Sequence, residues 1–222
     1  MTRPAAPDIL PDDATLTEAG ALLRASGARV LLVACGALAR EIVDLRAVNG
    51  WDHLEIACLP AILHNSPEKI APAARAIIEA RGAQFDQVFV VYADCGTGGA
   101  LEALCRETGA QMMRGPHCYA FFEGVEAFAA KGDADMTAFY LTDFLVRQFD
   151  AFVWRPLGLD RHPELLGTYF GHYERLVYLA QVDDPALDIQ AQDCARRMGL
   201  AYERRLTGYG DLAVDLARVA KG

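Results

Sequence analysis

Residues 87–99 read Gln-Val-Phe-Val-Val-Tyr-Ala-Asp-Cys-Gly-Thr-Gly-Gly. The β-branched and aromatic first half is typical of a buried strand, and the glycines after it indicate a tight turn. A helix is predicted at 100–108, where Gly109 ends it. The segment is therefore a strand, a turn and a helix in succession, which is the building unit of α/β proteins.

The same unit recurs along the chain. Further strands are predicted at 29–35, 54–59, 110–113, 176–180 and 202–206, and further helices at 37–48, 67–81, 185–198 and 213–219. This alternation predicts a Rossmann-like α/β fold, with a mostly parallel sheet flanked by helices. We expect a flexible arm at 1–15, a single domain over 16–222 and, within that domain, a helical insertion at about 119–175.

Composition narrows the class of protein. The chain has 222 residues, 53% of them hydrophobic, and a net charge of −9, which indicates a globular protein and argues against binding of nucleic acid. No apolar stretch reaches the roughly 18 residues of a membrane span. The N-terminus lacks the pattern of a signal peptide, so a cytoplasmic location is expected. In a reducing compartment the six cysteines are core residues, metal ligands or reactive thiols rather than disulfides.

Three cysteines follow predicted strands, and they are Cys35, Cys95 and Cys118. Because the carboxyl ends of parallel strands share one edge of a sheet, these thiols are predicted to converge there. Three thiolates with His117 or His172 as a fourth ligand suit a zinc ion, and three thiolates alone suit an iron–sulfur cluster. The other three cysteines, inside a strand or a helix, are expected to pack in the core: Cys58, Cys105 and Cys194. The alternative is that all six cysteines are packing residues.

Other polar residues are expected near the same edge. The candidate catalytic residues are His117, His172, Asp94 and Asp211. The candidates for binding an anionic or polar substrate are Arg114, Arg161, His64, Asn65 and the backbone N–H groups of Gly96, Gly98 and Gly99. Three of these predictions have structural alternatives: a local cap for His64, a core position among aromatic side chains for His172, and a plain tight turn for the glycines.

Residues 91–99 also resemble the first motif of the class I methyltransferases that use S-adenosylmethionine. Two features depart from that pattern. The motif follows the third predicted strand rather than the first, and the next strand ends at Met113-Arg114, where that family places an acid. This resemblance therefore supplies an alternative reading of the glycine-rich turn.

Seven motifs, in order along the chain, resemble the domain of unknown function family 1638 (DUF1638). They are Ala34-Cys-Gly-Ala-Leu38, Leu59-Pro-Ala-Ile-Leu-His-Asn65, Tyr92-Ala-Asp-Cys-Gly-Thr-Gly-Gly99, Gly115-Pro-His-Cys-Tyr-Ala-Phe-Phe122, Leu159-Asp-Arg-His-Pro-Glu-Leu165, Tyr169-Phe-Gly-His-Tyr173 and Thr207-Gly-Tyr-Gly-Asp211. The resemblance implies an association with corrinoid-dependent methyl transfer. It also implies corrinoid methyltransferase proteins as partners.

Together these observations predict a metal-binding enzyme or accessory protein, with a thiolate-bound zinc or iron–sulfur centre and a small-molecule substrate or cofactor, acting in corrinoid-linked one-carbon transfer. One alternative is a non-catalytic protein that binds a small molecule, a corrinoid or another tetrapyrrole. Another is a methyltransferase that uses S-adenosylmethionine. Neither a nucleic acid nor a membrane is expected as a partner, and a homo-oligomer is left open.

Overall fold

The computed structural model describes residues 10–221, without the side chains of residues 133 and 134. The chain divides into two compact units: the residues up to Arg114 together with those from Leu216 onward form one, and Gly115–Asp215 form the other. Each unit contains a sheet of its own, and the predicted α/β class is confirmed. The range 16–222, expected to form one domain, spans parts of both units. Of the expected N-terminal arm, residues 1–9 lie outside the described residues, and a helix begins at Asp13.

The first unit is built on a five-stranded sheet with the order β1-β3-β2-β4-β5. Its strands are β1 (Ala21–Leu23), β2 (Val30–Cys35), β3 (Leu54–Leu59), β4 (Gln87–Val91) and β5 (Gln111–Met112). Only β1 runs antiparallel to its neighbour. Every residue of β2 and β3 is buried, and all of them are apolar except Glu55, which pairs with Arg81.

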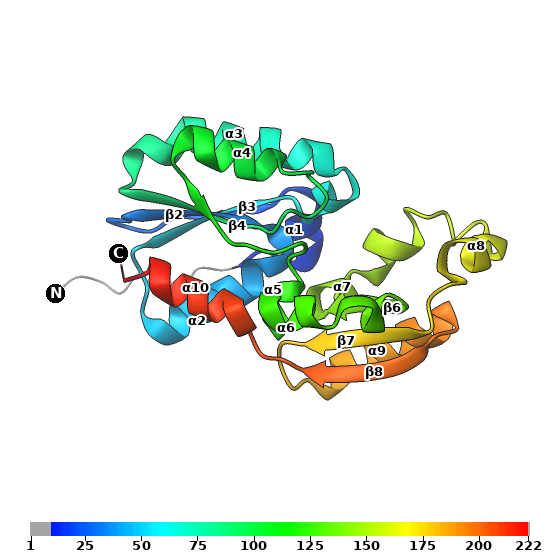
Figure 1. Ribbon diagram of the computed structural model, residues 1–222. Helices are drawn as coiled ribbons and strands as arrows, with labels where there is room; N and C mark the ends of the chain where they lie inside the picture. Colours follow the sequence, from blue (N-terminus) through cyan, green and yellow to red (C-terminus); the bar gives the residue numbers. More distant parts are fainter. Residues whose placement is uncertain (1–9, 222) are drawn as a thin grey trace. The chain divides into compact units, whose positions relative to one another are not determined.

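Helices cover both faces of this sheet. They are α1 (Asp13–Glu18), α2 (Ala39–Asn49), α3 (Ile70–Arg81) and α4 (Ala100–Thr108), with short 3-10 turns η1 (Gly36–Leu38), η2 (Ala61–Asn65), η3 (Pro67–Lys69) and η4 (Gly82–Gln84). In Figure 1, α3 and α4 lie on one face and α2 lies on the other. The connection from β2 to β3 therefore leaves on the opposite face from the connection from β3 to β4. The switch in direction falls between β2 and β4, at their carboxyl ends.

The second unit has a fully parallel sheet with the order β6-β7-β8. Its strands are β6 (Ala138–Thr142), β7 (Arg175–Ala180) and β8 (Ala201–Leu206). Its helices are α5 (Ala120–Glu123), α6 (Val125–Ala130), η5 (Gly132–Asp135), α7 (Asp143–Arg147), the π-helix η6 (Asp150–Trp154), η7 (Pro163–Leu165), α8 (Leu166–Phe170) and α9 (Pro185–Met198). The last helix, α10 (Gly210–Val219), begins in this unit and ends in the first.

The strand β6 lies within the predicted helical insertion, and with β7 and β8 it forms a sheet separate from that of the first unit. A buried carboxylate joins the ends of β6 and β7. Asp143 accepts hydrogen bonds from the Tyr178 hydroxyl (2.7 Å) and from the N–H groups of Gln181 (3.1 Å) and Val182 (3.2 Å). Burial raises the pKa of Asp143, although these donors favour its charged form.

Both faces of the second sheet are covered by other elements of the unit. α9 packs against β7 and β8, and the Tyr202 hydroxyl donates to Asp188 of this helix. Tyr119 and Phe128, from the α5–α6 segment, stack with Tyr140 of β6. Because Tyr202 and Tyr140 point to opposite sides of the pleat, both faces of this sheet are covered. Within residues 10–221, no helix is long and apolar enough to cross a membrane.

The first prediction concerns Gly210. A Cβ atom there would lie 2.3 Å from the Phe121 carbonyl oxygen, and the residue has a φ of +45°. We expect Gly210→Ala to lower the free energy of unfolding by about 1–3 kcal/mol for the forced contact, in addition to about 1–2 kcal/mol for the left-handed backbone. Gly208→Ala is the matched control, since Gly208 has a φ of +62° but nothing within 4 Å of its Cβ position. Urea unfolding that gives equal losses for both variants contradicts the close contact.

Candidate functional site

The switch point of the first unit holds two buried thiols. Cys35 is the last residue of β2, and Cys95 lies four residues beyond the end of β4. Their exposed fractions are 5% and 3%. The two sulfur atoms are close enough that a charge on Cys95 raises the pKa of Cys35. The structure thus brings together two of the three predicted ligands at the predicted edge.

The sulfur atom of Cys35 lies among groups that favour its anion. The N–H group of Ala37 and the hydroxyl of Tyr92 both donate to it. Burial outweighs these two donors and raises the pKa of Cys35 to about 12. At neutral pH the free thiol is therefore protonated, and Cys35 alone is a poor nucleophile. A bound cation would reverse this balance, because a coordinating thiol loses its proton.

Cys95 is held in an unusual backbone conformation. Its φ is +47°, and it is the one non-glycine residue with a positive φ in the described part of the chain. A side chain in this left-handed region costs roughly 1–2 kcal/mol. Strain of this kind is concentrated at functional sites, where the surrounding structure holds it in place. The strain here positions the thiol of Cys95 beside that of Cys35.

Two neighbouring residues explain how tightly this edge is built. A Cβ atom on Gly36 would lie 2.5 Å from the Leu16 carbonyl oxygen, so the glycine after Cys35 is required by backbone packing rather than by a ligand. Cys58 pairs in register with Ala34, next to Cys35 on the neighbouring strand, and burial together with a charge on Cys35 raises the pKa of Cys58 as well. Cys58 is buried, as a packing residue would be.

The glycine-rich turn is organised around Asp94. Its carboxylate accepts hydrogen bonds from the N–H of Gly99 (2.8 Å), the N–H of Gly98 (3.3 Å) and the hydroxyl of Thr97 (2.9 Å). The Gly99 donor, with the Thr97, Gly98 and Gly96 donors, holds the pKa of Asp94 below its ordinary value. The expectation that these N–H groups bind an anionic substrate meets a physical obstacle, because Asp94 already occupies the N–H groups of Gly98 and Gly99. Asp94 itself maintains the turn that carries Cys95.

The remaining candidates of the first unit are exposed. His64 and Asn65 lie in η2, directly after β3, and their side chains face solvent. Arg114 is exposed as well and is the last residue of this unit before the chain enters the second. Within residues 10–221, the side chains of these three residues make no hydrogen bond, ion pair or ring contact.

The other predicted site residues belong to the second unit. His117 stacks on Tyr119, with ring centroids 5.0 Å apart, and Cys118 is half-buried beside it in sequence. His172 is exposed, stacks on Tyr173 at 4.3 Å, and precedes β7 at its amino end. Arg161 is exposed and lies 3.8 Å from Asp160. Asp211 accepts a hydrogen bond from the N–H group of Val125 at the start of α6 (2.7 Å).

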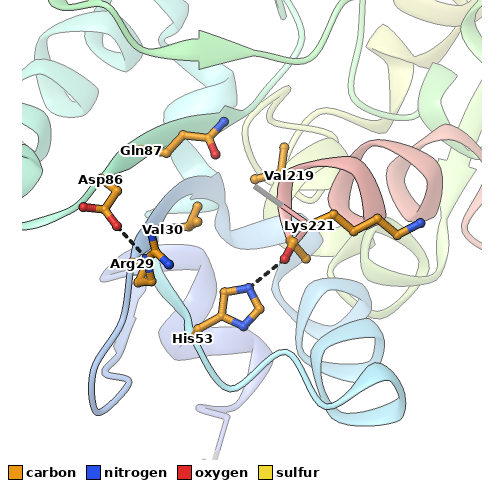
Figure 2. Close-up of a pocket in the computed structure, with 8 residues that line it drawn as sticks. Arg29, Val30, His53, Asp86, Gln87, Val219 and Lys221 are labelled. Carbon is orange, nitrogen blue, oxygen red and sulfur yellow. Dashed lines mark hydrogen bonds and ion pairs between the residues drawn. The ribbon is translucent and has the colours of Figure 1, made fainter.

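A cavity of 310 Å³ lies in the first unit at the amino ends of β2 and β4, the edge opposite Cys35 and Cys95 (Figure 2). Two pairs of its polar groups are in contact: Arg29 Nε is 2.6 Å from Asp86 Oδ2, and His53 Nε2 is 3.0 Å from the Ala220 carbonyl oxygen. The cavity joins the end of α10 to the sheet, and it places no reactive pair of groups together.

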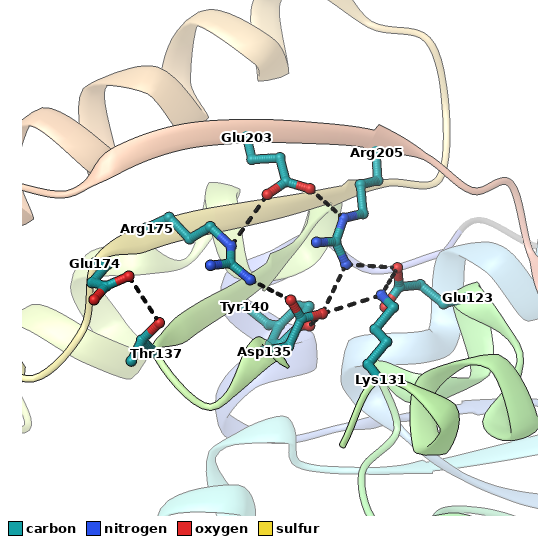
Figure 3. A network of polar contacts seen from close by, with 9 residues as sticks. All are labelled: Glu123, Lys131, Asp135, Thr137, Tyr140, Glu174, Arg175, Glu203 and Arg205. Atoms are coloured by element: carbon teal, nitrogen blue, oxygen red, sulfur yellow. Dashed lines mark hydrogen bonds and ion pairs between the residues drawn. The ribbon is translucent and has the colours of Figure 1, made fainter. Parts of the chain in front are cut away.

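The second unit contains a polar network that the sequence does not indicate (Figure 3). At its centre, Asp135 accepts from Tyr140, Arg175 and Arg205, and Glu203 bridges the two arginines. Burial raises the pKa of Asp135, but the hydrogen bonds from Tyr140, Arg205 and Arg175 outweigh it and hold the pKa far below its ordinary value.

The network continues to the α5–α6 segment through two more residues. Glu123 pairs with Arg205 (2.9 Å) and with Lys131, which also lies 3.3 Å from Asp135. The network contains three acidic and three basic side chains, so its formal charges cancel. We interpret this network as structural, because its charged groups already neutralise one another.

The chemistry available at the switch point is that of a soft ligand pair. Thiolates prefer zinc, copper(I) and iron–sulfur clusters over hard cations. Among the residues that the structure describes, no group of three or more His, Cys, Asp or Glu side chains is arranged to hold a metal ion. Cys35 and Cys95 therefore supply two ligands, and further ligands would have to complete any coordination sphere.

Comparison with known proteins gives one match. A family model described as "Protein of unknown function (DUF1638)" matches residues 58–214, which include Cys95, Cys118 and His172. No match was found among curated proteins or among solved structures.

The second prediction concerns Asp94. Because its pKa is lowered in the folded state, its contribution to stability is present above its unfolded pKa, about 3.9, and is lost as the pH falls through the lower folded value. We expect Asp94→Asn to lower the free energy of unfolding by about 1 kcal/mol at pH 7 and by less at pH 3.

Guanidinium unfolding at the two pH values checks this difference. Asp52→Asn is the control, because Asp52 is exposed and has no partner among the described residues; its effect should stay within about 0.5 kcal/mol. A loss at Asp94 that is equal at pH 7 and pH 3 contradicts the assigned hydrogen bonds.

Proposed function

Since the chain belongs to the DUF1638 family, described only as proteins of unknown function, we propose a function from its own geometry: the first unit binds a thiophilic metal ion through Cys35 and Cys95. The observation that carries this proposal is the pair of buried thiols at the switch point, one of them on a strained backbone. Ligands of open α/β sheets bind at this position.

The surroundings of Cys35 support a metal ion better than a free nucleophile. Two donors already point at its sulfur atom, and hydrogen bonds to thiolate sulfur tune metal–thiolate centres in this way. Without a cation, burial keeps the thiol protonated. A metal ion would replace that proton. Burial would then protect the metal–sulfur bond, because it keeps water away from that bond.

The strain at Cys95 supports the same proposal. Glycine would adopt a φ of +47° without strain, and Gly96, Gly98 and Gly99 follow immediately. A cysteine at this position is explained if its sulfur atom is needed where the strained turn places it.

The sequence also predicts Cys118 as a third thiolate, and zinc and an iron–sulfur cluster remain the two candidate centres. A role in corrinoid-linked one-carbon transfer follows from the family resemblance alone, and it stays a prediction for the same centre. A site for S-adenosylmethionine has less support, because Asp94 occupies the N–H groups of the glycine-rich turn.

The third prediction is tested by metal binding. Protein purified without oxygen is analysed for zinc, iron and acid-labile sulfide, and the metal-free chain is then titrated with Co²⁺ and with Zn²⁺ against a chromophoric chelator. We expect one metal ion or one cluster per chain and, with Co²⁺, a sulfur-to-cobalt charge-transfer band. Loss of an outer-shell partner alone weakens metal binding by about 10–100-fold, so Cys35→Ser and Cys95→Ser should each weaken it at least tenfold.

Two matched variants serve as controls. Cys105→Ser and Cys194→Ser also replace buried thiols, but these lie in α4 and α9 and should leave the affinity unchanged. Cys118→Ser tests the predicted third ligand separately. The proposal is wrong if the wild-type chain binds no stoichiometric metal, or if it binds metal equally well without Cys35 and Cys95.

A further inference from the structure

A second cavity lies entirely within the second unit, between α7, the π-helix η6 and α9. Its volume is 510 Å³, within the range of small-molecule pockets, about 300–1,000 Å³. We call it the arginine groove after four of the residues that line it: Arg147, Arg155, Arg196 and Arg197. Two aspartates, Asp150 and Asp193, also line it, which leaves an excess of two positive charges in a chain of net charge −9.

One arginine is fixed as part of the groove wall. The Arg197 guanidinium stacks over the Trp154 ring at 4.3 Å and over the Phe149 ring at 5.0 Å. It also pairs with Asp150 at 2.6 Å. Stacking and pairing together hold the planar group in a single orientation, so this side of the groove is preorganised.

Another arginine is available to a ligand. The side chain of Arg155 is exposed and makes no hydrogen bond or ion pair with any residue in the described part of the chain. Arg196, by contrast, is paired with Asp193 at 2.8 Å. A free guanidinium beside a fixed one offers the forked donors that carboxylates and phosphates accept.

The π-helix directs these groups into the groove. Arg155 donates its N–H to the Asp150 carbonyl oxygen (2.9 Å), and Leu159 donates to that of Trp154 (3.0 Å), both across five residues. Each such turn contains one residue more than an α-helical turn. Asp150 and Arg155 line the groove, and Asp150 and Trp154 both contact Arg197 of α9. π-Turns are rare and are found frequently at functional sites.

The groove also offers apolar surface. Ile189 of α9 lines it and is 65% exposed, and Val146 and Ala151 line it as well. We propose that the arginine groove binds a small molecule that carries a phosphate or carboxylate group beside an apolar part. This site is independent of the metal proposal, since every residue that lines it belongs to the second unit.

The fourth prediction uses Trp154 as a reporter, because its ring contacts Arg197 in the wall of the groove. The chain has two tryptophans, so Trp51→Phe leaves Trp154 as the single tryptophan, whose emission is followed with excitation at a wavelength that the tyrosines do not absorb. In this background we titrate pyrophosphate and citrate, with glycerol as the neutral probe. Pyrophosphate or citrate should change the Trp154 emission in a saturable manner, and added salt should weaken the response. Glycerol should have no effect. The stronger of the two anions indicates the preferred acid group.

The variant Arg155→Gln should weaken this binding about tenfold, because it removes the charge-assisted hydrogen bonds of the guanidinium. Arg24→Gln removes an exposed arginine of the first unit that does not line the groove, and it should leave the affinity unchanged. Circular dichroism confirms that each variant is folded. The proposal is overturned if neither anion gives a saturable change, or if Arg155→Gln binds as tightly as its parent.

Discussion

The parallel pairing of β2 with β3 on one side and with β4 on the other is the constraint on which the first unit depends. A crossover between parallel strands is right-handed, so reversing direction along the sheet sends α2 and α3 to opposite faces. No connection then covers the carboxyl ends of β2 and β4. Residues directly beyond these two strands meet there although they are distant in the sequence, and Cys35 and Cys95 occupy those positions.

The pair of thiols is placed where water does not stabilise their charged form. Burial raises the pKa of Cys35, whereas the donors from Ala37 and Tyr92 favour the anion. A bound cation would stabilise the thiolate form of Cys35, because it supplies the positive charge that replaces the lost contact with water. Metal binding of this kind would also stabilise the fold, since the unfolded chain lacks the strained turn that positions Cys95.

The sequence predicts several elements of both units well, because they carry clear end signals. The bounds of β3, α4 and α9 are confirmed residue for residue, since Gly109 and Gly199 end the two helices and Pro185 begins α9. The segment that contains β6 and α7 is harder to predict. β6 runs into α7 as one apolar segment, Ala-Phe-Tyr-Leu-Thr-Asp-Phe-Leu-Val-Arg, whose periodicity does not distinguish a strand from a helix.

The site is predicted in part, for physical reasons of the same kind. Strand ends locate Cys35 and Cys95, because position in a parallel sheet follows from the chain order. The role of Asp94 depends on a turn that folds back onto the carboxylate of Asp94. The arginine groove depends on the π-helical register, and neither feature is visible in residue spacing.

The most direct test of the metal proposal is an anomalous difference map from a crystal of the zinc-loaded protein. A peak about 2.3 Å from the sulfur atoms of both Cys35 and Cys95 is predicted; a zinc ion bound elsewhere, with no peak between these two atoms, would contradict it.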